Sequence, residues 1–156
     1  MARVFVGIGS NLGDRAETLR RAVEAMAALP ATAVKAVSRL HETEPVGIVD
    51  QPRFLNGAVE LETELDPDAL LAALLAIERE LGRDRASVPP GGPRTADLDL
   101  LVYGDRRIER SELEIPHPRL HERRFVLEPL AELDPALEVP GKGTVQTLLA
   151  RLDSAA

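Results

Sequence analysis

Two aspartates at spacing two, Asp97 and Asp99, are the residues of this chain that most directly suggest chemistry. They lie in the stretch GPRTADLDLLVYG, whose apolar character predicts a buried strand. Side chains two apart on a strand share a face, with Cα atoms roughly 7 Å apart at a rise of about 3.3 Å per residue. Carboxylates this close repel each other, and a divalent cation that accepts both as ligands removes the repulsion. The pair therefore predicts a Mg²⁺ site that phosphate oxygens complete. A solvent-facing strand that happens to be acidic is the alternative.

Cationic residues flank this strand. Three arginines precede it in GRDR and GPR, and PHPRLHERR follows it with His117 and Arg123. A guanidinium fork binds phosphate oxygens bidentately, so the cluster predicts a polyphosphate ligand. Because the sequence has no GxxxxGK[ST] loop, binding must depend on metal and arginine rather than on a glycine-rich cradle. For any single arginine, a surface salt bridge is the alternative.

Two phenylalanines, Phe54 and Phe125, adjoin polar loops rather than apolar runs. A flat ligand stacked between two rings requires such a placement, and a place in the core is the alternative.

The elements that must position these groups follow from periodicity and turn signals. Asp14 with Glu17 predicts a helix start, and Asp66 followed by proline predicts another. We expect strands at 4–8, 34–41, 54–65 and 92–104, helices after 14 and after 66, a turn into 107–115, a short helix, and a last helix at 144–152.

This strand-helix-strand-strand-helix-strand order predicts a ferredoxin-like α+β fold, with a four-stranded antiparallel sheet whose helices cover one face, in a single domain over 1–156. Alternation along the fourth strand places Leu98, Leu100 and Val102 on the helix-covered face, and Asp97, Asp99, Leu101 and Tyr103 on the other. The twelve-residue loop 42–53 is long enough to indicate function.

Composition narrows the classes of function. The net charge is −7 and aromatic residues make up 3%, which disfavours a nucleic-acid-binding sheet with its basic field and stacking rings. There is no cysteine, so thiolate metal sites and thiol nucleophiles are excluded. No stretch has the length of a signal peptide or membrane span, and we expect a cytoplasmic protein.

Two other functions compete with a metal-dependent phosphate site. Nucleotidyltransferases also pair a Gly-Ser element with a D-x-D strand, but within a couple of dozen residues, whereas Ser10 and Asp97 are far apart here. A non-catalytic regulatory module is the second, and failure to bind Mg-ATP would favour it.

Five motifs occur together in one order: VGIGSNLGDR, QPRFLNGAVELET, LLAIERELGRDR, GPRTADLDLLVYG and IPHPRLHERRFVLEPL. In this the chain resembles the 6-hydroxymethyl-7,8-dihydropterin pyrophosphokinases from about Val4 to Pro135, and GPRT-x-DLDLL beside PHPR is the most specific part. The resemblance implies a monomer that transfers pyrophosphate from ATP to a pterin alcohol in folate biosynthesis and releases AMP.

The resemblance also implies roles for individual positions. Asp97 and Asp99 would bind two Mg²⁺ ions and, with Arg83 and Arg94, form the catalytic group. The positions implied around ATP are Glu78, Arg83, Arg85, Arg94, Leu100, His117 and Arg123. Those implied around the pterin are Thr43, Pro45, Val46, Phe54, Asn56, Asp97 and Phe125, with the two rings enclosing it.

The chain departs from the family pattern at two places. Its loop ASVPPGG lacks the Arg-Trp pair that many members carry before GPR, and Glu44 stands where a proline is common. We expect the first departure to change the rate at which a lid over ATP closes.

Overall fold

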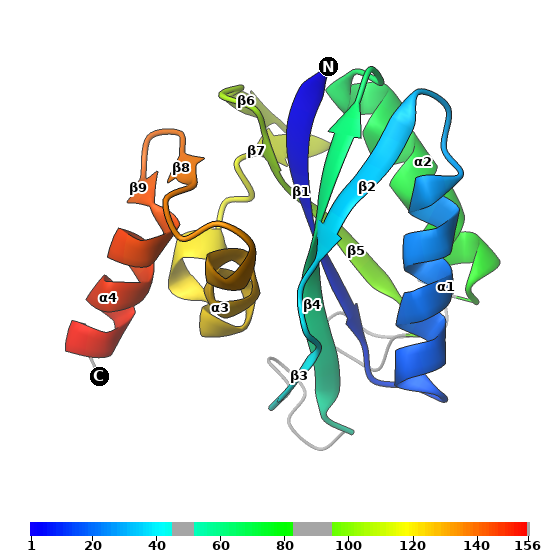
Figure 1. Cartoon of the computed structure of the whole chain (residues 1–156), viewed down its shortest axis with the longest axis horizontal. Coiled ribbons are helices and arrows are strands. Elements are labelled where there is room, and N and C mark those ends of the chain that lie inside the picture. The colour runs from blue at the N-terminus through cyan, green and yellow to red at the C-terminus, as the bar shows by residue number, and fades with distance from the viewer. Residues whose placement is uncertain (45–51, 83–94, 156) are drawn as a thin grey trace.

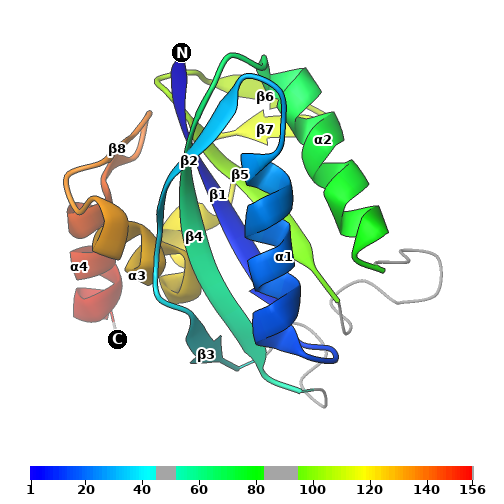
Figure 2. The ribbon, with the colours of Figure 1, turned by 45° about the vertical axis from the view of Figure 1, so that its right-hand side comes forward.

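A twisted antiparallel sheet divides the protein into three layers (Figure 1). The computed structural model describes residues 1–44, 52–82 and 95–155. Helices α1 and α2 cover one face of the sheet, and α3 and α4 lie on the other side, as the turned view in Figure 2 also shows. The elements are β1 (Ala2–Ser10), α1 (Arg15–Ala27), β2 (Thr32–Val37), β3 (His41–Thr43), β4 (Phe54–Thr63), α2 (Pro67–Glu80), β5 (Asp97–Tyr103), β6 (Ile108–Arg110), β7 (Leu113–Ile115), a 3₁₀ turn (Leu120–Glu122), α3 (Arg124–Leu133), β8 (Glu138–Val139), β9 (Gly143–Thr144) and α4 (Val145–Ala155).

The central sheet has the strand order β2-β4-β1-β5, and every neighbouring pair is antiparallel. With α1 after β1 and α2 after β4, this arrangement confirms the predicted ferredoxin-like α+β class. The short strand β3 also pairs with β4, beyond the end of β2. Within the described ranges, no helix is long and apolar enough to cross a bilayer.

The predicted strand over 34–41 is in fact two strands, and a bulge separates them. Val37 pairs with Val59 of β4, and His41 pairs with Asn56. The chain from β2 to β3 therefore contains one residue more than the part of β4 that faces it. The bulge passes close over Gly57, where an added Cβ would lie 2.9 Å from Leu40 Cδ2. A side chain at this position would displace the end of the Leu40 side chain, and glycine avoids this contact.

The two predicted helix starts are confirmed. The Asp14 side chain accepts a hydrogen bond from the Glu17 N–H at 3.2 Å, and Asp66 accepts one from the Ala69 N–H at 2.8 Å. Both helices pack on a core that joins them to one sheet face, formed by residues such as Val6, Leu19, Leu61, Leu70, Leu74 and Leu100.

Helices α1 and α2 cover one sheet face as predicted, but further helices, which the sequence did not place, cover part of the other face. A second core joins α3 and α4 to the opposite face, where Leu127 and Leu130 pack with Phe5, Ala58 and Leu101. Because α3 covers only part of this face, the rest stays open at the end of the sheet that carries Asp97 and Asp99.

A second bulge corrects the predicted faces of β5. Phe5 pairs with Val102 but Val6 pairs with Leu100, so Leu101 is the extra residue. Beyond it the alternation inverts: Val102 joins the α3 core and Tyr103 joins the α1–α2 core, the reverse of the prediction. Asp97 and Asp99 lie before the bulge and keep their predicted shared face.

Candidate active site

The open end of the sheet holds a pocket of about 300 Å³. Its floor is the sheet, and one wall is the N-terminal end of α3. Its lining residues are Gly7, Ile8, Gly9, Thr43, Glu44, Phe54, Asn56, Gly57, Asp97, Asp99, Arg123, Phe125 and Val126.

Strand register places the residues of the pocket floor in two rows, each of which crosses β4, β1 and β5. Gly9 of β1 lies between Asn56 of β4 and Asp97 of β5, and Gly7 lies between Ala58 and Asp99. Residues directly opposite each other in antiparallel strands point to the same face. The carboxylates therefore stand beside a strip of β1 that carries no side chain.

Close approach of a side chain explains why glycine occupies the first row. A Cβ added at Gly9 would lie 2.6 Å from Asn56 Oδ1, nearer than real Cβ contacts. The Asn56 amide thus lies over the β1 backbone and occupies the space that a side chain would fill. At Gly7 the nearest atom to an added Cβ, Leu101 Cδ1, is 3.4 Å away.

Hydrogen bonds fix the β4 side of the pocket. Asn56 Nδ2 donates to Thr43 Oγ1 of β3. Buried Asn11 donates through Nδ2 to the Pro52 carbonyl at 2.9 Å, just ahead of Phe54. At the rim, Arg53 pairs with Glu44 at 2.9 Å. These contacts hold Phe54 and Asn56 where both face the pocket.

The α3 side brings a cation and a ring. Arg123 is the N-cap residue of α3, and its guanidinium lies over the Phe125 ring at 5.6 Å from the centroid. Phe54 and Phe125, predicted from loop-adjacent positions, thus line one pocket from β4 and α3.

His117 lies close to this charge cluster without lining the pocket. Burial lowers the pKa of His117 below 6.5, the positive charges of Arg123 and Arg119 lower it further, and Asp97 partly opposes them. The ring is therefore neutral near pH 7, and its Nδ1 accepts a hydrogen bond from the Arg119 N–H at 3.3 Å.

Glu78, predicted beside ATP, lies beneath the strand instead of in the pocket. It is 2% exposed on α2, and its carboxylate accepts a hydrogen bond from the Leu98 N–H at 2.7 Å. Leu98 separates Asp97 from Asp99, so Glu78 holds the backbone that carries both carboxylates. A direct contact with ATP stays a prediction.

Leu100 is likewise predicted beside ATP, and its side chain packs in the α1–α2 core, 5% exposed. A contact with ATP would have to involve its backbone, and it stays a prediction. Five other predicted residues, Pro45, Val46, Arg83, Arg85 and Arg94, lie outside the described residues, as does the loop ASVPPGG.

Sequence reasoning missed several lining residues. Gly7 and Gly9 became recognisable only through their register between Asn56 and the aspartates. The motif GIGSN contained a signal, since two glycines two apart leave one strand face bare. Sequence reasoning also missed the lining residues Ile8, Glu44, Gly57 and Val126. It missed Asn11 as well, whose hydrogen bond to the Pro52 carbonyl supports the segment that leads into Phe54.

The donor set fits Mg²⁺. The pocket offers two carboxylates on one strand face, and the described residues contain no group of three or more His, Cys, Asp or Glu side chains placed to hold a metal ion. A cation here would take its remaining ligands from water and substrate phosphate, which is the usual arrangement for Mg²⁺ and unlike that of structural zinc or calcium cages.

Comparison with known proteins gives one consistent family. The sequence profile described as 7,8-dihydro-6-hydroxymethylpterin-pyrophosphokinase (HPPK) matches residues 5–135. A 2-amino-4-hydroxy-6-hydroxymethyldihydropteridine pyrophosphokinase of Bacillus subtilis (strain 168) is 50% identical over 129 residues, which cover 83% of this chain and 76% of the relative. A protein of the same name from Pseudomonas aeruginosa is 45% identical over 148 residues, which cover 95% and 90%.

Solved structures agree on the fold. A crystal structure of Plasmodium falciparum HPPK-DHPS wild type with pteroate has a TM-score of 0.76 at 15% identity, over 98% of this chain. This chain spans only 42% of that one. The likeness shows a shared fold.

Proposed function

The chain belongs to the 7,8-dihydro-6-hydroxymethylpterin-pyrophosphokinase family, and we propose that the pocket over Gly7 and Gly9 is where its reaction takes place. The reaction transfers pyrophosphate from ATP to the hydroxymethyl group of 6-hydroxymethyl-7,8-dihydropterin and releases AMP, a step of folate biosynthesis. The observation that carries the assignment is the row Asn56–Gly9–Asp97, which sets an amide and a carboxylate on either side of a bare strand.

The pterin end of the pocket comprises Phe54, Asn56, Thr43 and Phe125. The two rings present flat apolar faces, and the Asn56 amide presents a donor and an acceptor to the edge of a bicyclic ring. Asn56 holds one orientation because Thr43 accepts from its Nδ2. In this orientation the pterin hydroxymethyl group would lie toward Asp97.

The phosphate end comprises Asp97, Asp99 and Arg123. The hydroxymethyl oxygen forms a bond to the β-phosphorus of ATP while the bond from that phosphorus to the α–β bridging oxygen breaks, and the hydroxyl proton is lost. Asp97 and Asp99 would hold two Mg²⁺ ions, which when bound neutralise charge on the phosphate oxygens. Arg123 would bind phosphate oxygens by charge-assisted hydrogen bonds, and neutral His117 would donate one.

Glu78 acts indirectly, by placing two of these groups. Its carboxylate accepts the hydrogen bond from the Leu98 N–H and so fixes the spacing of the two carboxylates.

The remaining contacts are proposed from the family motifs alone. Arg83, Arg85 and Arg94 would bind ATP, and Arg83 and Arg94 would also assist transfer. Pro45 and Val46 are proposed to contact the pterin on the same basis. We further propose a cytoplasmic monomer with one catalytic domain over 1–156.

Product identity tests the proposal. The protein is mixed with Mg-ATP and 6-hydroxymethyl-7,8-dihydropterin, and the nucleotides and pterins are separated. AMP formed one-for-one with a pterin diphosphate is the expected result. ADP would show transfer of a single phosphate, and nucleotide release independent of the pterin would show a misassigned substrate.

A further inference from the structure

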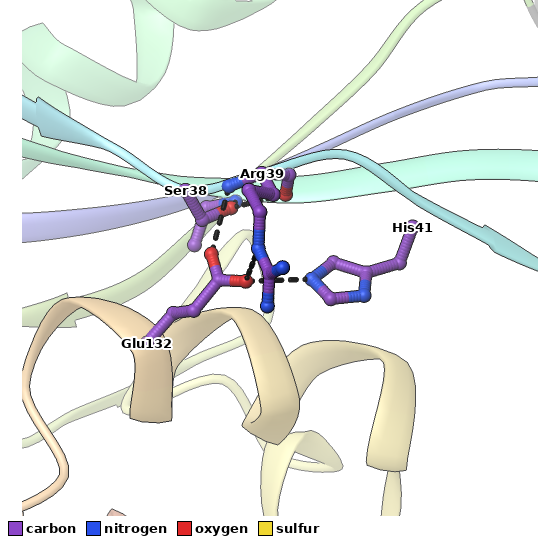
Figure 3. Close-up of polar contacts among 5 residues, drawn as sticks. Ser38, Arg39, His41 and Glu132 are labelled. Atoms are coloured by element: carbon purple, nitrogen blue, oxygen red, sulfur yellow. Dashed lines mark hydrogen bonds and ion pairs between the residues drawn. The ribbon is translucent and has the colours of Figure 1, made fainter.

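Outside the pocket, the carboxylate of Glu132 contacts both a backbone N–H and side chains from a distant part of the sequence. Glu132, near the C-terminal end of α3, accepts hydrogen bonds from the Arg39 backbone N–H at 2.7 Å and from Arg39 Nε at 2.8 Å, and its Oε1 lies 3.1 Å from His41 Nε2 (Figure 3). Arg39 lies in the connection between β2 and β3, and His41 is the first residue of β3, so these groups are 91 to 93 residues from Glu132 in sequence. Glu132 thus joins α3 to that connection.

The connection needs such a partner because it is the bulge over Gly57. Ser38 still bonds to β4: its N–H donates to the Ala58 carbonyl, and its hydroxyl accepts from the Ala58 N–H, both at 2.9 Å. The Arg39 N–H comes next, where the ladder is interrupted, and Glu132 is its acceptor. The carboxylate therefore fixes the point at which the strand leaves β2 and turns into β3.

The two elements that Glu132 joins, α3 and β3, both contribute residues to the pocket. On one side, β3 continues from His41 to Thr43, which holds Asn56. On the other side, Phe125 precedes Glu132 by seven residues on the same helix, so the two lie on one face of α3 about 10 Å apart along the axis at a rise of about 1.5 Å per residue. A shift of α3 relative to the bulge would change the separation of Phe125 from Thr43 and Asn56.

We propose that Glu132 is a positioning residue for the pterin, which sets the distance between the α3 wall and the β3–β4 wall of the pocket. This inference rests on the proposed function of the pocket. Within the link, the backbone hydrogen bond has the larger role, because the Arg39 side chain is 83% exposed and its ion pair is weakened by water, whereas the Glu132 side chain is 23% exposed. The two contacts can therefore be separated by mutation.

The kinetic test uses Glu132→Ala, Glu132→Gln, Arg39→Ala and a control. Glu132→Ala removes the acceptor of the Arg39 N–H, and we expect the KM for the pterin to rise about tenfold while the KM for ATP changes less than about twofold. Glu132→Gln keeps an acceptor oxygen and should restore most of the affinity. Arg39→Ala keeps the backbone N–H and should change either KM less than about twofold. The control Glu128→Ala, one turn earlier on α3, removes an exposed pair with Arg124 and should behave as wild type.

Equal increases in both KM values, or a lower melting temperature with no change in either, would show a merely structural role and overturn the proposal. If Glu132→Ala does not fold, the same comparison is made with Glu132→Leu, which keeps most of the side-chain volume but offers no acceptor oxygen to the Arg39 N–H, and its pterin KM must then exceed that of Glu128→Ala.

A second measurement does not depend on turnover. Amide hydrogen exchange of the peptide covering 38–44 should be faster in Glu132→Ala than in wild type and in Glu128→Ala, because the Arg39 N–H loses its acceptor. Unchanged exchange there would overturn the link itself. If the wild-type chain makes no AMP from the pterin, the proposed function fails, and exchange still decides whether Glu132 holds the bulge.

Discussion

Asp97 and Asp99 share one strand face in a pocket, although like charges at this spacing disfavour folding. If they bind the cation and phosphates as proposed, changing them should separate activity from stability. We predict that Asp97→Asn and Asp99→Asn each reduce kcat by about 10²-fold or more while the melting temperature of the ligand-free protein stays within a few degrees or rises. Rates of AMP formation and thermal unfolding measure the two effects. Loss of the ligand-free fold with retained turnover would instead make the aspartates structural.

Gly9 allows a prediction about the amide across the strand. The methyl group of Gly9→Ala would lie 2.6 Å from Asn56 Oδ1 and must displace it, so we expect the KM for the pterin to rise about tenfold or more. Gly7→Ala is the matched control, because its methyl enters the same pocket but lies 3.4 Å from Leu101 Cδ1 and leaves Asn56 in place. Steady-state kinetics with the pterin varied would compare them. A pterin KM for Gly9→Ala equal to that of the wild-type chain would contradict the role given to Asn56.

The aspartates and phenylalanines could be selected from sequence because residue type and local pattern were sufficient. Glycines and supporting residues were not accessible in this way. The importance of Gly9 depends on its being opposite both Asn56 and Asp97, which are 47 and 88 positions away and meet it only through strand register. Glu78 was selected for ATP by resemblance, and its burial under β5 emerged only in three dimensions.

At the scale of elements, α2 supports β5 through Glu78. Glu78→Ala would leave the Leu98 N–H without this acceptor in a buried strand, and we predict a loss of about 1–3 kcal/mol in the free energy of unfolding. Exposed Glu80 on the same helix is the control, and Glu80→Ala should change stability by less than about 0.5 kcal/mol. Urea unfolding measures both. A Glu78→Ala protein as stable as the Glu80→Ala protein would show that Glu78 does not support β5.

The link between α3 and the bulge should depend on pH. Although burial by itself would raise the pKa of Glu132, hydrogen bonds from the Arg39 side chain and backbone and from His41 outweigh it and hold this pKa below 4.5. The contribution of the link to stability is therefore complete above pH 4.5 and is lost as the pH falls through the lower, folded-state pKa. We predict that the difference in the free energy of unfolding between wild type and Glu132→Gln does not change with pH at values just above about 5, and that it shrinks below about pH 4.5. Urea unfolding at several pH values would show this, and a difference that persists unchanged at pH 3 would contradict it.

Elements were predictable where periodicity continued without interruption. The caps at Asp14 and Asp66 and the four long strands follow from local sequence. Both errors in strand assignment arose at bulges, because an extra residue reverses the alternation on which the assignment depends. Neither the Ser38–Leu40 segment nor Leu101 is marked by proline or glycine, and Gly57, which makes room for the first bulge, lies on the partner strand.

At the scale of the whole molecule, charge determines how ATP can bind. The chain has a net charge of −7, and the carboxylates of Asp97 and Asp99 face the pocket that contains the proposed phosphate site. A polyphosphate without Mg²⁺ is therefore repelled at long range by the net charge and at short range by the two carboxylates. We predict that Mg-ATP at about 100 times its Kd raises the free energy of unfolding by about 2.7 kcal/mol, and that the same ATP with EDTA raises it by less than about 1 kcal/mol. Urea unfolding with each additive provides the measurement. The Asp97→Asn/Asp99→Asn double variant is the control: with fewer like charges and no carboxylate ligands, it should respond to ATP almost equally with and without the metal. Equal stabilisation of the wild-type chain by ATP under both conditions would mean that the two aspartates do not bind a cation, and their shared strand face would need another explanation.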